Sequence, residues 1–146
     1  YAGLIQTATG PKVIEFNARF GDPETQVVLA RLESPLSEII SSLLVKEQPT
    51  IAWNELASVG VVVAAEGYPN QYKTNLPLPE MSGETIYYAG VTRSEQALVS
   101  AGGRIFLAEA TASTLEEARK KVYQTLDNYS FPGMYYRKDI GVKGLI

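Results

Sequence analysis

Polar and apolar residues alternate between Lys12 and Phe20, which is the period of a strand with one buried face. Before this segment, the apolar residues 1–7 lead into Ala8-Thr9-Gly10-Pro11, whose glycine and proline favour a tight turn. The pattern predicts a β-hairpin. The second strand would carry Glu15, Asn17 and Arg19 on its polar face and would anchor in a core through Ile14, Phe16, Ala18 and Phe20.

Two helices are predicted after the hairpin. Gly21-Asp22-Pro23-Glu24 favours a helix start with Asp22 as the N-cap, followed by a short apolar helix at residues 26–32 packed under the sheet. Ser34-Pro35 favours a second start, with Ser34 as the N-cap and a helix to about Lys46. Its apolar residues recur at three- and four-residue spacing and predict one buried stripe, namely Leu36, Ile39, Ile40, Leu43 and Leu44.

The second half of the chain favours strands and one long helix. The polar, proline-containing residues 47–50 mark a boundary, and Trp53 is expected to pack against the connection that follows. Strands are predicted at residues 57–65, 86–91, 104–111 and 134–137, and a loop at residues 72–82. A helix begins at Thr114 with the capping box Thr114 and Glu117, and buries Leu115, Ala118, Val122, Leu126 and Tyr129.

This order predicts an α+β fold, in which a hairpin and helices precede a small, mainly antiparallel β-rich unit with one long helix.

The composition limits the possible chemistry, because the 146 residues include no cysteine and no histidine. Thiol chemistry and histidine bases are therefore excluded. The net charge of −3 argues against nucleic acid as a partner, and the basic clusters at residues 119–121 and 137–138 are interpreted as solvated faces. With no apolar run long enough to cross a bilayer, we expect a soluble, cytoplasmic protein without a membrane partner.

Glu15 and Asn17 are the candidate metal ligands. Residues two apart on a strand lie about 7 Å apart, so a carboxylate and an amide at this spacing can converge on one hard cation such as Mg²⁺. Arg19 would then lie near the anion that the metal carries, and a helix start at Asp22 and Glu24 would also attract anions. The alternatives are a solvated strand face for the first three residues, which the strand alone favours, and simple capping for Asp22.

The run VIEFNARFGDPETQVVLARL, residues 13–32, closely resembles the end of the ATP-grasp domain in the phosphoribosylamine–glycine ligase family of purine biosynthesis, also called glycinamide ribonucleotide synthetases. Further segments look like the landmarks of that family's C-terminal domain, in the same order: Gly67-Tyr68-Pro69, Ala89-Gly90, Gly102-Gly103-Arg104, residues 114–119 and residues 136–141. The resemblance therefore covers essentially the whole chain.

The resemblance implies that residues 1–46 are the C-terminal end of an ATP-grasp domain, residues 47–56 a linker and residues 57–146 the family's C-terminal domain. It implies a ligase that joins glycine to 5-phosphoribosylamine through a glycyl phosphate, with ATP as co-substrate and Mg²⁺ or Mn²⁺ bound by Glu15 and Asn17. Arg19 would steady the acyl phosphate or the glycine carboxylate, and Asp22 would orient the amine or the ribose phosphate.

The chain begins at Tyr1 without an initiator methionine, so we expect upstream domains of the same enzyme to complete the site and this chain alone to be inactive. It departs from the family pattern at Ala30, Tyr88, Val91 and Val142, none of which is a metal ligand. Arg104, Arg137 and Asp139 are interpreted as a buried Arg–Asp network or turn-fixing contacts. The alternatives are a related ATP-grasp ligase of the purine pathway and a non-catalytic interaction module.

Overall fold

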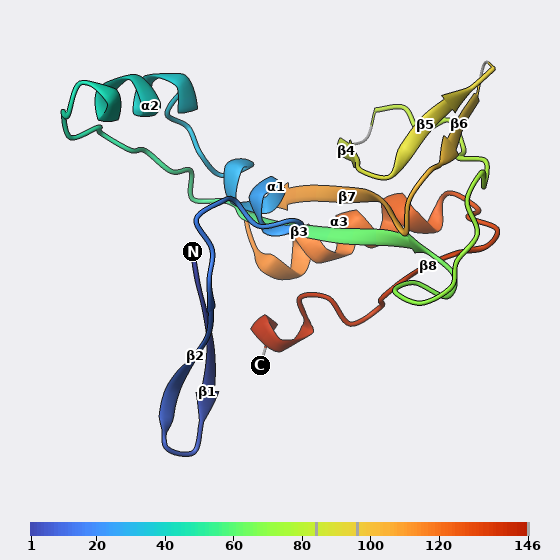
Figure 1. The fold of residues 1–146 in the computed structure, drawn as a ribbon, viewed down its shortest axis with the longest axis horizontal. Helices are drawn as coiled ribbons and strands as arrows, with labels where there is room; N and C mark the ends of the chain where they lie inside the picture. Colours follow the sequence, from blue (N-terminus) through green and yellow to red (C-terminus); the bar gives the residue numbers. More distant parts are fainter. Residues whose placement is uncertain (84, 96, 146) are drawn as a thin grey trace.

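The hairpin expected at the start of the chain is present. The computed structural model describes residues 1–83, 85–95 and 97–145, so residues 84, 96 and 146 of the expected C-terminal domain lie outside the described residues. Strands β1 (Ala2–Thr7) and β2 (Gly10–Phe16) pair in antiparallel fashion, with Thr7 opposite Gly10. Figure 1 shows this hairpin projecting away from the rest of the chain.

The second strand is shorter than predicted, and its apolar face is not buried. Strand β2 ends at Phe16 rather than Phe20, because Phe16 pairs with Ala2 and only Tyr1 remains on the partner strand. The side chains of Ile14, Phe16 and Phe20 are 65%, 78% and 61% exposed. The prediction that this face anchors in a core is therefore wrong within the described chain.

Both helix starts differ from the predicted caps. Helix α1 (Glu24–Leu29) has Pro23 at its N-cap position, with no side-chain cap, so Asp22 is not the N-cap. Helix α2 (Leu36–Leu44) has Pro35 at that position. The Ser34 hydroxyl instead accepts a hydrogen bond from the Ala52 amide at 2.8 Å and donates one to the Thr50 carbonyl at 3.3 Å. Ser34 thus ties the start of α2 to the returning segment.

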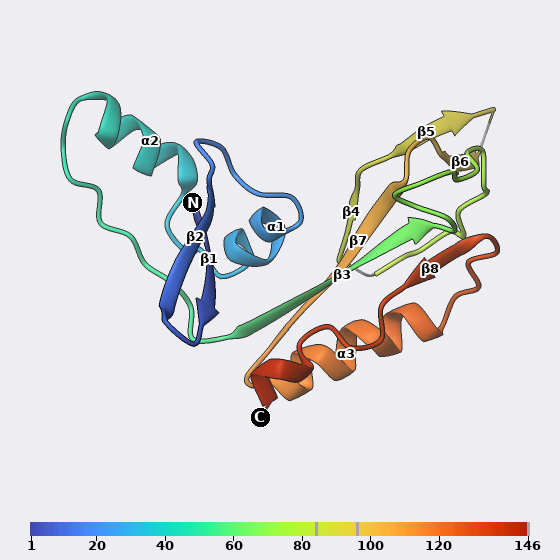
Figure 2. The same ribbon diagram turned by 60° about the horizontal axis from the view of Figure 1, so that its bottom comes forward.

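Helix α2 lies at the end of the molecule opposite the paired strands β5 (Val91–Ser94) and β6 (Ala97–Ser100) in both Figure 1 and Figure 2. Of its expected buried stripe, Ile39 is buried, whereas Ile40, Leu43 and Leu44 are 48%, 58% and 78% exposed. Most of the stripe is therefore exposed in the described chain. Trp53, the expected packing anchor, pairs with Leu32 in an isolated β-bridge and remains 45% exposed.

The second half of the chain folds around a four-stranded antiparallel sheet of order β4-β7-β3-β8. Its strands are β3 (Ala57–Ala65), β4 (Thr85–Tyr88), β7 (Arg104–Ala112) and β8 (Met134–Tyr136), as expected apart from their ends. Residues 72–82 form the predicted loop, with one isolated bridge between Pro77 and Val99. Strands β5 (Val91–Ser94) and β6 (Ala97–Ser100) form a separate pair that the sequence did not predict.

Helix α3 (Leu115–Asp127) covers one face of this sheet, as Figure 2 shows. Thr114 is its N-cap as predicted, because its hydroxyl accepts a hydrogen bond from the Glu117 amide at 3.2 Å. The core between helix and sheet is formed by small and β-branched residues of β3 and β7 and by one face of α3, including Val59, Val61, Val63, Phe106, Ala108, Ala118, Val122 and Leu126. Tyr129, expected on that face, is half-buried just beyond the helix.

A short 3₁₀ turn, η1 (Val142–Leu145), ends the described chain. Arg119 is not the solvated residue that its basic neighbours suggested, because its guanidinium donates to the carbonyls of Ile140 and Lys138 at 2.9 and 2.6 Å. Arg137 and Asp139 form a local, exposed pair with an Nε–Oδ1 distance of 2.9 Å. That pair is a turn contact rather than a buried network.

The observed fold is thus a small mixture of helices and antiparallel sheets, which confirms the α+β expectation at that level. Within the described residues, no helix is both long enough and apolar enough to cross a bilayer.

Candidate functional site

Tyr1 organises the open end of the hairpin, where the two candidate metal ligands lie. Its backbone nitrogen donates to the Asn17 carbonyl at 2.7 Å, and its own carbonyl accepts from the Asn17 backbone N–H at 2.8 Å. Its phenol donates to Glu15 Oε1 at 3.2 Å. Partial removal from water and this bond to Glu15 both raise the pKa of the Tyr1 phenol. The phenol therefore stays a neutral donor that holds one carboxylate oxygen of Glu15.

Glu15 and Asn17 offer a donor set that fits magnesium. The Glu15 side chain is exposed and has no cationic partner among the described residues. Asn17 is half-buried, and its Nδ2 is buried without a hydrogen-bond partner among the described residues. An N–H donor suits an oxygen of water or substrate, whereas Oδ1 is the atom that could bind a metal. One carboxylate and one amide oxygen, completed by water and phosphate, is a typical magnesium set.

No group of three or more histidine, cysteine, aspartate or glutamate side chains that could hold a metal ion lies together in residues 1–83, 85–95 and 97–145. The expected row of three polar residues on one strand face is not formed, because β2 ends before Asn17 and Arg19.

Arg19 and Glu24 lie close to the same end of the hairpin. Arg19 is exposed, donates from Nη1 to the Phe20 carbonyl at 3.0 Å, and has no acidic partner in the described part of the chain. The Glu24 carboxylate lies over Gly21, where an added Cβ would be 1.7 Å from Glu24 Oε2 and 3.1 Å from the Tyr1 ring. Gly21 thus lets Tyr1 and Glu24 approach each other closely.

Asp22 has a different environment, because Arg104 holds it from the other half of the chain. Arg104 Nη1 donates to the Asp22 carbonyl at 2.8 Å, and Nη2 lies 3.1 Å from Asp22 Oδ2. Gln26 Nε2 approaches Asp22 Oδ1 at 3.4 Å, while Gln26 Oε1 is buried without a hydrogen-bond partner in the described part of the chain. Asp22 and Gln26 line an open cleft of about 440 Å³. Its lining residues are Phe20, Gly21, Asp22, Thr25, Gln26, Leu29, Ala30 and Tyr87.

The structure therefore brings Glu15 and Asn17 together around Tyr1 and places Asp22 in the adjoining cleft. Sequence reasoning missed both Tyr1 and Arg104 as partners of these residues. The position of Tyr1 opposite Asn17 depends on an irregularity in the hairpin between Gly3 and Leu4, which shifts the register by one residue. No local pattern in the sequence marks that shift.

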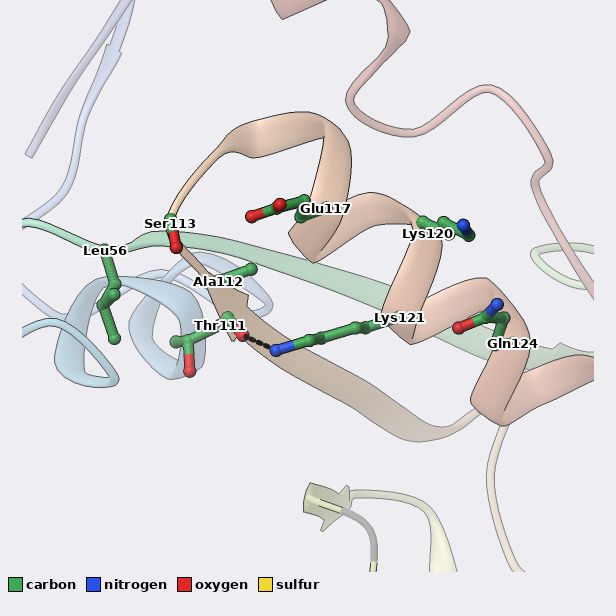
Figure 3. A pocket seen from close by; sticks show the side chains of 8 residues that line it. All are labelled: Leu56, Thr111, Ala112, Ser113, Glu117, Lys120, Lys121 and Gln124. Atoms are coloured by element: carbon green, nitrogen blue, oxygen red, sulfur yellow. Dashed lines mark hydrogen bonds between the residues drawn. The ribbon is translucent and has the colours of Figure 1, made fainter.

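Another hollow, of about 610 Å³, lies between the end of β7 and the first turns of α3 (Figure 3). Lys121 reaches across it and donates to the Thr111 carbonyl at 3.2 Å, as the dashed line shows. Glu117 and Lys120 line the same hollow, so opposite charges share it. None of the candidate residues from the sequence lies there, and the arrangement indicates no particular chemistry.

Glycines of the second half contact the backbone of Arg104. The Gly90 amide donates to the Arg104 carbonyl at 2.9 Å, and the Gly90 carbonyl accepts from Ala101 at 2.7 Å. A Cβ on Gly90 would lie 2.7 Å from both the Arg104 oxygen and the Gly102 Cα, and one on Gly103 would lie 2.1 Å from the Tyr68 ring. These glycines permit close backbone contacts that no larger residue would allow.

Comparison with known proteins shows what this chain is similar to. The chain is 51% identical to the phosphoribosylamine–glycine ligase of Halalkalibacterium halodurans over 149 aligned residues, which cover 99% of this chain and 35% of the relative. The corresponding ligases of Lactococcus lactis and Streptococcus pneumoniae are 50% and 48% identical, with 99% of this chain and 36% of each relative covered. The chain thus spans about a third of the length of these relatives.

A crystal structure of the phosphoribosylamine–glycine ligase from Thermotoga maritima superposes with a TM-score of 0.84 at 30% identity, over 94% of this chain and 35% of that one. The family model described as "Phosphoribosylglycinamide synthetase, C domain" matches residues 58–143, which is more than half of the chain. The resemblance inferred from the sequence is therefore confirmed, and this chain belongs to the phosphoribosylglycinamide synthetase C-domain family.

Proposed function

We propose that this chain is the C-terminal part of a phosphoribosylamine–glycine ligase, which joins glycine to 5-phosphoribosylamine at the expense of ATP and forms glycinamide ribonucleotide. The observation that carries the proposal is the 51% identity to a relative of that name along 99% of the chain. The segment that resembles an ATP-grasp end, residues 13–32, lies within the aligned region and contains all four candidate site residues.

The packing of the chain supports a division into two parts. In this proposal, residues 1–46 are the end of the ATP-grasp domain, residues 47–56 the linker and residues 57–146 the C-terminal domain. Among the described residues, Ile39 is the one buried hydrophobic residue that precedes Ala57, and all the others belong to the second half. An element that buries so little by itself needs another domain to cover it.

Upstream domains of the same enzyme are the partner that we propose for the N-terminal part. Two apolar surfaces are open to receive them: the hairpin face with Ile14 and Phe16, and the α2 stripe with Leu43 and Leu44. These residues alternate with polar ones in the patterns of a half-buried strand and an amphipathic helix. Since the pattern is that of buried elements, the missing half of each interface lies outside this chain, and the chain alone is inactive.

Glu15 and Asn17 would hold Mg²⁺ or Mn²⁺ through one carboxylate oxygen and the amide Oδ1. When bound, the metal neutralises charge on the phosphates of ATP and so favours transfer of the terminal phosphoryl group to glycine. Tyr1 supports the pair, because its phenol fixes one Glu15 oxygen and its backbone fixes the Asn17 peptide. The other Glu15 oxygen is left to face the metal.

Arg19 and Asp22 would bind the substrates. Arg19 is exposed and free of acidic partners in the described chain, so its guanidinium is available to the glycyl phosphate or to the glycine carboxylate. Asp22 carries negative charge into the cleft beside Gln26. The Asp22 carboxylate only accepts hydrogen bonds, so it suits the N–H groups of the amine of 5-phosphoribosylamine better than the oxygens of its phosphate.

The metal assignment is tested in the full-length enzyme with the double variant Glu15→Gln, Asn17→Ala. We expect glycine-dependent ATP cleavage to fall by about a hundredfold, and the Mg²⁺ concentration for half-maximal activity to rise by a similar factor, because both oxygen ligands lose their affinity for the cation. Glu116→Gln, on an exposed position of α3, is the matched control and should leave both quantities unchanged.

Unchanged ATP turnover and magnesium dependence in the double variant would show that the metal assignment is wrong. Turnover of the wild-type enzyme with bicarbonate or formate in place of glycine would contradict the proposed reaction itself.

A further inference from the structure

Arg104 reaches from the first residue of β7 to the loop that precedes α1. There it contacts Asp22, which lies 82 positions away in the sequence. One guanidinium makes two contacts with the same residue: Nη1 donates to the Asp22 carbonyl at 2.8 Å, and Nη2 pairs with the carboxylate at 3.1 Å. The first contact fixes the backbone of the loop, and the second fixes the direction of its carboxylate.

The base of Arg104 is itself held firmly. Arg104 pairs with Ala64 of β3, and the Arg104 carbonyl accepts a hydrogen bond from the Gly90 backbone N–H at 2.9 Å. The first contact belongs to the sheet that carries the core of the second half, and the second comes from the turn that follows β4. The side chain therefore extends from a fixed point, which is the condition for holding another group in place.

The loop has few other contacts that could orient Asp22. Within it, the Thr25 amide donates to the Gly21 carbonyl at 3.0 Å, and Gln26 Nε2 lies 3.4 Å from Asp22 Oδ1. These bonds stay inside the segment and do not tie it to the sheet. Helix α1 also touches β3 through Val27, whose Cγ1 would lie 2.7 Å from a Cβ on Gly60, but that contact is apolar and does not address the carboxylate.

We propose that Arg104 is a positioning residue for the ligase reaction: from the C-terminal domain, it sets the orientation in which Asp22 meets the amine of 5-phosphoribosylamine. The inference rests on the proposed function and on the role given there to Asp22. The pair is half exposed, with side-chain exposures of 40% and 49%, so its contribution to overall stability is small and its effect is on geometry.

A lysine at position 104 could not replace the arginine fully. An ammonium is a single point charge, whereas the planar guanidinium presents two parallel N–H groups that match a carbonyl and a carboxylate at once. Arg104→Lys should therefore keep the attraction to Asp22 and lose the simultaneous backbone contact. This difference separates positioning from a simple requirement for positive charge.

The test uses the full-length enzyme and the variants Arg104→Ala and Arg104→Lys. For Arg104→Ala we expect kcat/KM for 5-phosphoribosylamine to fall by about ten- to a hundredfold, the range that follows from a small misplacement of a substrate-orienting group. The KM for ATP should not change. Arg104→Lys should lie between the alanine variant and the wild type, and millimolar guanidinium should restore part of the activity of Arg104→Ala. Arg137→Ala, which breaks an exposed pair elsewhere in the second half, is the matched control and should retain wild-type kinetics.

A second readout does not depend on activity. Amide hydrogen exchange of residues 20–29 should become faster in Arg104→Ala, because the loop loses its tie to the sheet. Unchanged exchange, or faster exchange with unchanged kinetics for 5-phosphoribosylamine, would overturn the positioning role and leave the proposed function standing. If Arg104→Ala does not fold, as judged by circular dichroism, Arg104→Lys decides by the same two measurements. A folded wild-type enzyme without glycine-dependent ATP cleavage would overturn the proposed function itself, and the positioning role with it.

Discussion

Asp127, at the last position of α3, accepts hydrogen bonds from two residues of the segment that follows. The Tyr136 hydroxyl donates to its Oδ1 at 2.8 Å, and the Lys138 ammonium at 3.1 Å. These two bonds, the one from Tyr136 first, lower the pKa of the Asp127 carboxyl. Because its folded pKa lies below the unfolded value of about 4, the fold favours the ionised form. The stabilisation is therefore present above about pH 4 and is lost as the pH falls through the folded pKa.

Asp127→Asn should accordingly be less stable than the wild type at pH 7, with a difference that narrows on acidification and vanishes below the folded pKa. Thermal unfolding midpoints of the two chains at pH 7, 5 and 3 measure this. Glu116→Gln, at an exposed position, is the control. The difference between its unfolding midpoint and that of the wild type should not narrow between pH 7 and pH 3. An Asp127→Asn penalty of equal size at pH 7 and pH 3 would contradict the assignment.

At this same scale, the sequence predicts a contact when its partners are neighbours in the chain. Thr114 was correctly expected to cap α3, because the amide that it binds belongs to Glu117, three residues later. The contact between Arg104 and Asp22 spans 82 residues, and no local rule connects them. Asp22 itself was expected to cap α1, but its carboxylate is bound by Arg104 instead. Competition from a distant partner thus overrode a sound local preference.

Among the elements, the most accurately predicted strand is one of the two most buried strands. Strand β3 spans residues 57–65 as expected, and its alternate residues Val59, Val61 and Val63 are at most 4% exposed. A β-branched run of this length has few other stable conformations. The β5–β6 pair was missed because each of its strands has only four residues and little alternation. The exposed stripe of α2 shows that a pattern predicts a face to be buried without saying which part of the protein buries it.

The two neighbouring valines of β3 test this reading of the strand. Val61 is fully buried towards α3, whereas Val62 lies on the opposite face and is half-buried. Val61→Ala should lower the free energy of unfolding by roughly 2 kcal/mol, since it leaves a cavity in a close-packed core. Val62→Ala removes the same atoms from a partly open site and should cost about 1 kcal/mol or less. Urea unfolding of both variants measures the difference, and equal losses would show that the two faces of β3 are packed alike.

For the molecule as a whole, burial is distributed very unevenly along the chain. Residues 57–145 contain nearly all of the described core, while the hairpin and α2 present Phe16 and Leu44, each 78% exposed, to solvent. We therefore predict that a chain of residues 57–146 retains a cooperative thermal transition within a few degrees of the 146-residue chain. It should also self-associate less, because it lacks the two apolar surfaces. Differential scanning calorimetry and sedimentation velocity at several concentrations measure the two effects.

Loss of the cooperative transition on removal of residues 1–56 would mean that α1, through Val27 on Gly60, and Asp22, through Arg104, are required parts of the C-terminal fold. Retention would show that the core of the second half folds without these contacts.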